Sequence, residues 1–155
     1  MKEDKHFLKI AIGKSKDSIR LKGFPVGAIL VKDNKIISEG ISNGKNLNDP
    51  TSHAETDAIR KACEKLKTRN LKDLTLYSSL EPCLMCFSAS NWASIKKIVY
   101  AVKKESVSKQ HFQGDTKLEE INEKNYNKIE LIHIPSLEES ALEIINNWES
   151  SQKTI

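Results

Sequence analysis

Two periods of hydrophobic residues alternate along the chain, and together they predict which segments are strands and which are helices. Short, nearly continuous apolar runs are typical of buried strands, whereas apolar residues spaced three or four apart mark one face of a helix. The runs predict strands at residues 24–31, 35–40, 74–80, 96–102 and 128–134. The helical spacing predicts helices at residues 2–21, 53–67, 82–94 and 136–151, with a short further helix near 115–124.

The order of these elements predicts the fold class. The turn residues "KDN" at 32–34 join the first two strands as a hairpin, and "SNGKNLNDPTS" at 42–52 is predicted to be a polar loop. The later strands are connected through helices, which is typical of parallel strands with right-handed crossovers. We therefore expect an α/β protein, a three-layer α-β-α sandwich around a mixed, mostly five-stranded sheet, built as a single domain over residues 1–155.

Two helix starts carry local signals. Pro82 is predicted to open the helix at 82–94, because proline is well placed in a first turn. Ser136, with Glu139 three residues later, has the spacing of a capping box. Ser136 is therefore predicted to be the N-cap of the last helix.

Composition and charge narrow the class of protein. The chain is 38% hydrophobic and 30% charged, which is ordinary for a globular protein. No apolar run approaches the roughly 18 residues of a membrane helix, and "MKEDKHFLKIAIGK" lacks the apolar core of a signal peptide. We expect a cytoplasmic protein with no membrane partner. A net charge of +4 is mild for a nucleic-acid-binding protein, so nucleic acid is not the expected partner.

The three cysteines favour metal or catalytic use, since their number is odd and no export signal suggests disulfides. Cys83 and Cys86 stand in "EPCLMC" three positions apart, and so on one side of a helix start. Free N–H groups and the helix dipole favour thiolates there. The pair alone is compatible with a redox centre, half of a structural zinc site, part of a catalytic metal site, or core packing.

The tripeptide "HAE" adds His53 and Glu55 to the candidates. On a regular helix these two side chains would point about 200° apart, so they cooperate only if His53 lies at an irregular helix start. The preceding "DPTS" makes such a start the expected arrangement. His53 would then supply a third ligand beside the two cysteines, and both helix starts would lie at one edge of the sheet.

Three ligands predict a catalytic zinc rather than a structural one, because structural sites are usually closed by a fourth protein ligand. Cys63 lies ten residues along the helix from His53, about 15 Å away, which is too far. His111 and His133 are not excluded by distance. An open position would hold a water, and Glu55 beside it could accept a proton and deliver it elsewhere.

"HAE" followed about 27 residues later by "PCLMC" resembles the zinc-dependent cytidine deaminase superfamily, whose pattern is H-x-E…P-C-x-x-C. The resemblance implies that His53, Cys83 and Cys86 bind one Zn²⁺ per chain. It implies hydrolytic deamination, in which zinc-bound hydroxide attacks the amino-bearing ring carbon. Glu55 is then the catalytic proton shuttle between the hydroxide, the ring nitrogen and the departing amine.

Within this superfamily, "NDPTSHAE", "LTLYSSLEPCLMC" and "PVGAILV" resemble the branch of bacterial guanine deaminases and tRNA adenosine deaminases. The tRNA enzymes carry a "TGAAGS"-like segment and a basic C-terminal helix, whereas this chain has "KESVSKQHFQGDTKLEEI" and an acidic "SLEESALEIINNWESSQ". The resemblance therefore favours guanine deamination to xanthine and ammonia. The alternatives are a tRNA adenosine deaminase, which makes inosine, and a deaminase of cytosine or another aminated heterocycle.

The same resemblance suggests substrate contacts. "HFQGDTKLEEI" is similar to a guanine deaminase segment and places Asp115 at, or one residue from, a base-recognising aspartate; "SASNWASIKKIVYA" brings Trp92 into register. Ser42 stands where the family has a base-binding Asn, with Asn43 next to it, and Phe24 could stack on a base. Each also has a simpler interpretation: a helix cap for Asp115, core or dimer packing for Trp92, a turn for Asn43, and packing for Phe24.

The resemblance also suggests a homodimer, and Ile155 stands where a swapped tail can bring an aromatic residue to the pocket. Two other classes compete with the enzyme. A zinc-stabilised structural module would need a fourth protein ligand and would tolerate loss of Glu55. A redox Cys-x-x-Cys protein would leave His53 and Glu55 without a role.

Overall fold

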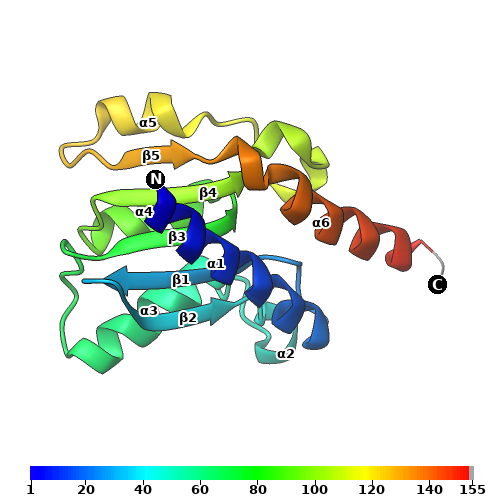
Figure 1. The fold of residues 1–155 in the computed structure, drawn as a ribbon, viewed down its shortest axis with the longest axis horizontal. Helices are drawn as coiled ribbons and strands as arrows, with labels where there is room; N and C mark the ends of the chain where they lie inside the picture. The colour runs from blue at the N-terminus through cyan, green and yellow to red at the C-terminus, as the bar shows by residue number, and fades with distance from the viewer. Residues whose placement is uncertain (154–155) are drawn as a thin grey trace.

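The computed structural model describes residues 1–153, and within them it contains a five-stranded mixed sheet of order β2-β1-β3-β4-β5 (Figure 1). Strand β1 runs antiparallel to β2 and β3, whereas β4 runs parallel to β3 and β5. The predicted α/β class and mixed sheet are therefore confirmed, and Ile155 lies outside the described residues. The strands are β1 (Gly27–Lys32), β2 (Lys35–Ile41), β3 (Thr75–Leu80), β4 (Lys97–Val102) and β5 (Glu130–His133).

Helices cover both faces of the sheet, as the three-layer prediction requires. In Figure 1, α1 and the start of α6 lie in front of the sheet, α3 and α4 lie behind it, and α5 runs beside the edge strand β5. Three short 3₁₀ turns, at 104–106, 109–111 and 135–137, lie in the second half. The helices are α1 (Lys2–Arg20), α2 (Gly44–Leu47), α3 (Ala54–Leu66), α4 (Leu84–Trp92), α5 (Leu118–Lys124) and α6 (Glu138–Gln152).

The β1–β2 hairpin turns where the sequence predicts it. Asp33 and Asn34 both have positive φ, 49° and 59°, and Lys32 pairs with Lys35 across them. Two positive φ values in a two-residue loop suit the twist of a hairpin, and Asp and Asn tolerate them.

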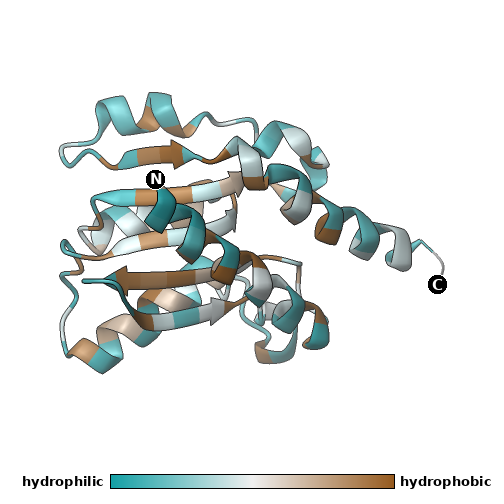
Figure 2. Ribbon diagram, viewed as in Figure 1, coloured by the Kyte–Doolittle hydropathy of each residue, from teal (hydrophilic) through white to brown (hydrophobic). Residues whose placement is uncertain are grey.

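The core is formed by the central strands and by the buried stripes of the helices that pack on them, and β1 is brown along most of its length in Figure 2. Strands β1 and β3 are buried along almost their whole length, as strands covered by helices on both sides must be. Phe7, Leu8, Ala11 and Ile12 form the buried stripe of α1. This spacing matches the helical period of the sequence, so α1 packs by its predicted face.

One buried ionic group ties α1 to the sheet. The Asp4 carboxylate accepts hydrogen bonds from the Tyr77 hydroxyl at 2.8 Å and from Lys97 Nζ at 2.9 Å. Burial alone would raise the pKa of Asp4, but the hydrogen bonds from Lys97 and Tyr77 outweigh it, and the net pKa is lowered. Asp4 therefore stabilises the fold as a carboxylate.

Two local predictions are corrected. The predicted loop at 42–52 contains the one-turn helix α2, whose N-cap is Asn43. The predicted capping box of the last helix is wrong: Pro135 starts a 3₁₀ turn through Leu137, and α6 begins only at Glu138 with Leu137 at its N-cap position. Ser136 therefore lies inside the 3₁₀ turn, because the fixed φ of Pro135 starts a turn before the helix.

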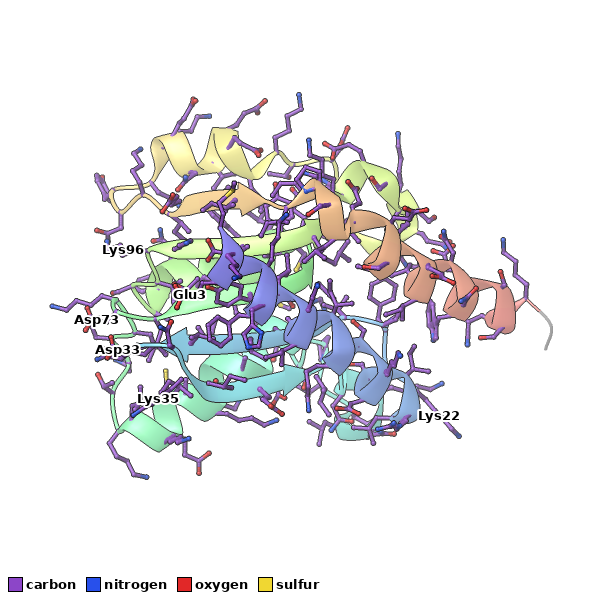
Figure 3. The ribbon with its side chains drawn as sticks, in the orientation of Figure 1. Glu3, Lys22, Asp33, Lys35, Asp73 and Lys96 are labelled. Carbon is purple, nitrogen blue, oxygen red and sulfur yellow. The ribbon has the colours of Figure 1, made fainter. Side chains whose placement is uncertain are left out.

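The two ends of the sheet differ in character. At one end, loops carry charged residues such as Asp33, Asp73 and Lys96 (Figure 3), and Lys32 Nζ lies 3.5 Å from the Asp73 carboxylate. At the other end, β3 and β4 finish, and β3 leads into "EPCLMC". Among residues 1–153, no helix has the length and apolar character needed to cross a membrane.

Candidate active site

Two helix starts meet at the end of β3 and bring the predicted ligands together. His53 is the N-cap of α3, with an extended backbone (φ −84°, ψ 165°), and Cys83 is the N-cap of α4 (φ −69°, ψ 168°). Cys86 lies in the first turn of α4. The prediction that His53 precedes the regular helix is confirmed, whereas the helix predicted to start at Pro82 starts two residues later.

The Thr56 hydroxyl fixes the start of α3. Its Oγ accepts the backbone N–H of His53 at 3.0 Å, and the Asp57 amide donates to the His53 carbonyl at 2.9 Å. The reach-back of the third helical residue to the N-cap is one half of a capping box. It holds the His53 backbone outside the helix, so the imidazole and the Glu55 side chain both face the site although they are two residues apart.

The spacing of the three ligands fits a zinc ion. His53 Nδ1 lies 3.6 Å from Cys83 Sγ and 3.5 Å from Cys86 Sγ. Tetrahedral zinc, with bonds of about 2.0–2.1 Å to nitrogen and about 2.3 Å to sulfur, separates those ligands by about 3.6 Å. His53, Cys83 and Cys86 thus form the zinc site of the protein.

Within the described part of the chain, this trio is the group of His, Cys, Asp or Glu side chains arranged to hold a metal. Cys63 is half-buried elsewhere on α3, as its distance along the helix predicts. His133 Nε2 donates to the Ala101 carbonyl oxygen at 2.9 Å and lies 3.2 Å from Glu138 Oε2, and His111 pairs with Glu149. Three protein ligands leave a coordination position for water, which is typical of catalytic zinc and disfavours a closed structural site.

The pKa values of the two thiols shift in opposite directions. The hydrogen bond from Cys86 lowers the pKa of Cys83 to about 4, with His53 adding to the effect against the opposing influence of burial. The same bond, together with burial, raises the pKa of Cys86. Zinc binds thiolates, so metal binding must expel the Cys86 proton.

Glu55 is buried beside the ligands, with 4% of its surface exposed. Its Oε2 lies 3.5 Å from Cys86 Sγ, and its Oε1 lies 3.1 Å from the Ser78 hydroxyl. Burial, followed by the negative charge of Cys83, raises the pKa of Glu55. A carboxyl with a raised pKa exchanges protons more readily near neutral pH, which suits a general acid and base.

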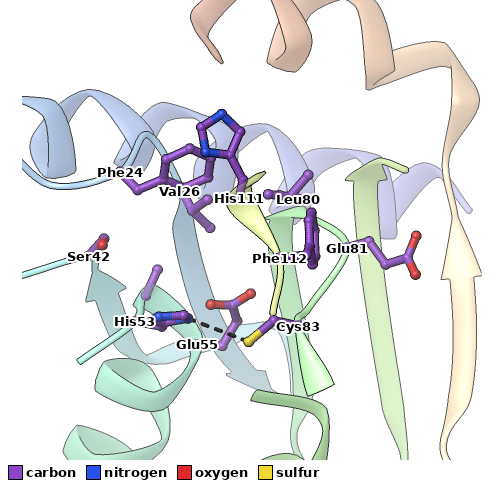
Figure 4. Close-up of a pocket in the computed structure, with 11 residues that line it drawn as sticks. Phe24, Val26, Ser42, His53, Glu55, Leu80, Glu81, Cys83, His111 and Phe112 are labelled. Atoms are coloured by element: carbon purple, nitrogen blue, oxygen red, sulfur yellow. Dashed lines mark hydrogen bonds between the residues drawn. The ribbon is translucent and has the colours of Figure 1, made fainter. Parts of the chain in front are cut away.

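A pocket opens directly above this carboxyl, as Figure 4 shows. The space between its atoms is about 530 Å³, including the part open to solvent. Phe24 and Ser42, both predicted as substrate contacts, line it. The remaining lining consists of the site residues and a mostly apolar wall: Val26, His53, Ala54, Glu55, Leu80, Glu81, Cys83, His111 and Phe112.

His111 and Phe112 were not foreseen as pocket residues. They belong to the polar stretch after β4, where "HF" interrupts a run of charged and small residues. The His111 ring lies 4.5 Å from the Phe24 ring, between centroids, and its Nε2 lies 2.6 Å from Glu149 Oε1. Trp148 packs on Phe24 at 5.3 Å. Helix α6 therefore supports the pocket wall from outside.

The other three predicted contacts lie outside the lining of this pocket. Asn43 is the N-cap of α2, and its Oδ1 accepts a hydrogen bond from Asn46. The Asp115 side chain is 94% exposed, and its carboxylate lies 3.9 Å from Lys104 Nζ. Trp92 is 88% exposed near the end of α4. Their contact with substrate stays a prediction.

The sequence of the chain matches a family of known proteins. The family model for the cytidine and deoxycytidylate deaminase zinc-binding region matches residues 1–102. The guanine deaminase of Bacillus subtilis (strain 168) is 42% identical over 117 residues, which cover 75% of each chain. A tRNA-specific adenosine deaminase of Aquifex aeolicus (strain VF5) is 42% identical over 96 residues, 62% of this chain and 64% of that one.

The fold agrees with these relatives. A solved structure from studies of A-to-I editing by tRNA:A34 deaminases superposes with a TM-score of 0.78 at 28% identity, covering 90% of this chain and 99% of its own. Guanine deaminases and tRNA adenosine deaminases are thus similarly close. The fold is cytidine deaminase-like, the metal site and Glu55 are in place, and the chain belongs to the zinc-binding cytidine and deoxycytidylate deaminase family, as a zinc-dependent deaminase.

Proposed function

We propose that the protein deaminates a free nucleobase, with guanine as its first substrate, giving xanthine and ammonia. The observation that carries the proposal is the charge of α6, the helix that packs on His111 at the pocket wall through Trp148 and Glu149. This helix has four glutamates and no lysine or arginine. Surfaces that bind RNA present clustered cations to the phosphates, so an acidic helix here favours a small uncharged base.

The pocket walls also suit a flat heterocycle. Phe24 and Phe112 offer rings on which a base can stack, while Val26 and Leu80 exclude water from its edges. We assign Phe24 and Ser42 as substrate contacts, since the Ser42 hydroxyl can both donate and accept a hydrogen bond.

Asn43, Asp115 and Trp92 are proposed as contacts that a rearranged loop or a second chain would supply. Trp92 lies on the surface, where it is available to another copy of the chain. The proposed assembly is accordingly a homodimer. Sedimentation equilibrium of the zinc-loaded protein separates a dimer from a monomer.

Zinc bound by His53, Cys83 and Cys86 would act as a Lewis acid that lowers the pKa of water, so that a nucleophile is available at neutral pH. The chain does the rest. The apolar wall holds the ring so that its amino-bearing carbon faces the Glu55 carboxyl. Glu55 accepts a proton from the attacking water and passes protons to the ring nitrogen and to the departing amino group. A carbon–oxygen bond forms, the carbon–nitrogen bond breaks, and ammonia leaves.

A substrate panel tests the proposal. Zinc-loaded protein is incubated with guanine, cytosine, adenine, their nucleosides and a tRNA anticodon stem-loop, and released ammonia is measured. We expect guanine to give the highest kcat/KM. Ammonia from the stem-loop alone, with salt-sensitive binding, would overturn guanine in favour of tRNA, and ammonia from cytosine alone would reassign the base.

A tRNA adenosine deaminase is the second candidate. It is favoured by the superposition described above, which spans 99% of the tRNA:A34 deaminase structure. The two candidates differ in what must lie next to α6. A tRNA over the pocket would bring phosphates to the end of this acidic helix that contacts His111, and a free guanine would not.

A further inference from the structure

Two adjacent serines on β3 face opposite sides of the sheet. Ser78 is fully buried, and its Oγ lies 3.1 Å from Glu55 Oε1 and 2.7 Å from the Leu80 carbonyl oxygen. Ser79 points the other way, and its Oγ lies 3.1 Å from Ser15 Oγ and accepts the Gly27 amide at 3.1 Å. Since side chains alternate along a strand, only Ser78 reaches the active site.

Glu55 has few groups to hold its carboxyl in place. Apart from the amide of its own residue, its hydrogen-bond partners in the described part of the chain are Ser78 and Cys86. A cysteine that ligates zinc is a thiolate and has no proton to donate. Once Cys86 serves the metal, the Ser78 hydroxyl is the side-chain donor that remains for Glu55.

The Ser78 hydroxyl is suited to a partner that gains and loses a proton. A hydroxyl has one hydrogen and two lone pairs, so it cannot donate to Glu55 and to the Leu80 carbonyl together. Donation to Glu55 suits the carboxylate. Donation to the Leu80 carbonyl leaves a lone pair that accepts from the protonated carboxyl. The same oxygen thus holds Glu55 in one position in both forms.

We propose that Ser78 is a positioning residue, whose buried hydroxyl keeps the Glu55 carboxyl aimed at the pocket throughout the reaction. This inference rests on the proposed role of Glu55 as proton carrier. It does not depend on which base is the substrate.

Kinetics of Ser78→Ala provide the first test, with Ser79→Ala as the matched control on the same strand. We expect Ser78→Ala to lower kcat by about ten- to a hundredfold, the loss typical of a misplaced catalytic group, with KM within twofold. Zinc content should stay at one per chain, and the melting temperature should match that of Ser79→Ala. An unchanged kcat, or an equal loss of kcat in Ser79→Ala, would overturn the proposal. If Ser78→Ala is insoluble, Ser78→Cys, which retains the shape but donates weakly, replaces it with the same readings.

Crystal structures of the zinc-loaded wild type and Ser78→Ala provide a test that needs no substrate. We expect the Glu55 carboxyl to turn or spread over several orientations in the variant. A carboxyl that keeps its place would overturn the positioning role. The kinetic ratio is measured on whichever panel compound releases ammonia, so an error about guanine is distinguished from an error about Ser78.

Discussion

Replacing Gly40 with alanine should displace active-site residues, although Gly40 itself does not line the pocket. Gly40 lies on β2 against the first turns of α3, the helix whose start carries His53 and Glu55. A Cβ at this position would lie 1.9 Å from the Ala54 carbonyl oxygen and 2.6 Å from the Ala58 nitrogen. Both are backbone atoms, so the clash is relieved only if the helix moves.

The size of the effect follows from these distances. Real Cβ atoms essentially never approach closer than 3.0 Å, so α3 must retreat from β2 by about 1 Å. Overpacking of this kind costs about 1–3 kcal/mol. For a chain of this size, that lowers the melting temperature by about 2–4 °C per kcal/mol. A displacement of about 1 Å at a catalytic group costs about a hundredfold in rate.

Differential scanning calorimetry and ammonia release measure the two effects, with zinc content as a third reading. Gly13→Ala is the matched control, because Gly13 lies inside α1 with no atom within 4 Å of its added Cβ. That variant should keep full activity and gain about 0.5–1 kcal/mol, since alanine suits a helix better than glycine. Wild-type stability and wild-type rate in Gly40→Ala would show that the contact with β2 does not position α3.

Three further outcomes are expected. Asp4→Asn should lower the free energy of unfolding by about 1.5–3 kcal/mol at pH 7, because it removes the carboxylate that pairs with Lys97. Folding lowers the pKa of Asp4, so the difference between the variant and the wild type should shrink as the pH falls below the ordinary value of 3.8. Urea unfolding at pH 7 and pH 3 measures this difference. Glu149→Ala should raise KM severalfold by releasing His111 from α6, while Glu143→Ala, exposed on the same helix, should leave steady-state kinetics unchanged. Chelation of zinc should abolish ammonia release and lower the melting temperature while far-UV circular dichroism persists, and added zinc should restore both.

The metal site could be predicted from sequence because its information is local. Cys83 and Cys86 lie within one turn, and "DPTS" before His53 predicts the irregular helix start that the structure has. The contact between the two helix starts is long-range in sequence. It could still be predicted, because the order of strands and helices places both helix starts at the same end of the sheet.

The pocket wall could not be predicted in the same way. Residues 103–117 have no helical or strand period, so nothing in their pattern places His111 and Phe112 beside Phe24. Their position depends on contacts with α6, far along the chain. The start of α6 was missed for a related reason: the Ser136 and Glu139 spacing was suitable, but Pro135 had already begun a 3₁₀ turn.

The predicted substrate contacts also differ in whether the sheet positions them. Phe24 and Ser42 lie at the ends of short connections next to β1 and β2, so the sheet positions them at the pocket. Asn43 and Asp115 lie in polar segments whose conformation is set by local turns and ion pairs. Chain register alone does not determine where such side chains point.

The most direct test of the central claim compares the zinc-loaded wild type with Glu55→Gln on the substrate that the panel identifies. Glutamine keeps the shape of the side chain but cannot carry the proton, and Glu55 is not among the three metal ligands. We expect one zinc per chain in both proteins and ammonia release slowed by at least about a hundredfold in the variant. Ammonia release within twofold of wild type, with zinc retained, would show that Glu55 is not the proton carrier.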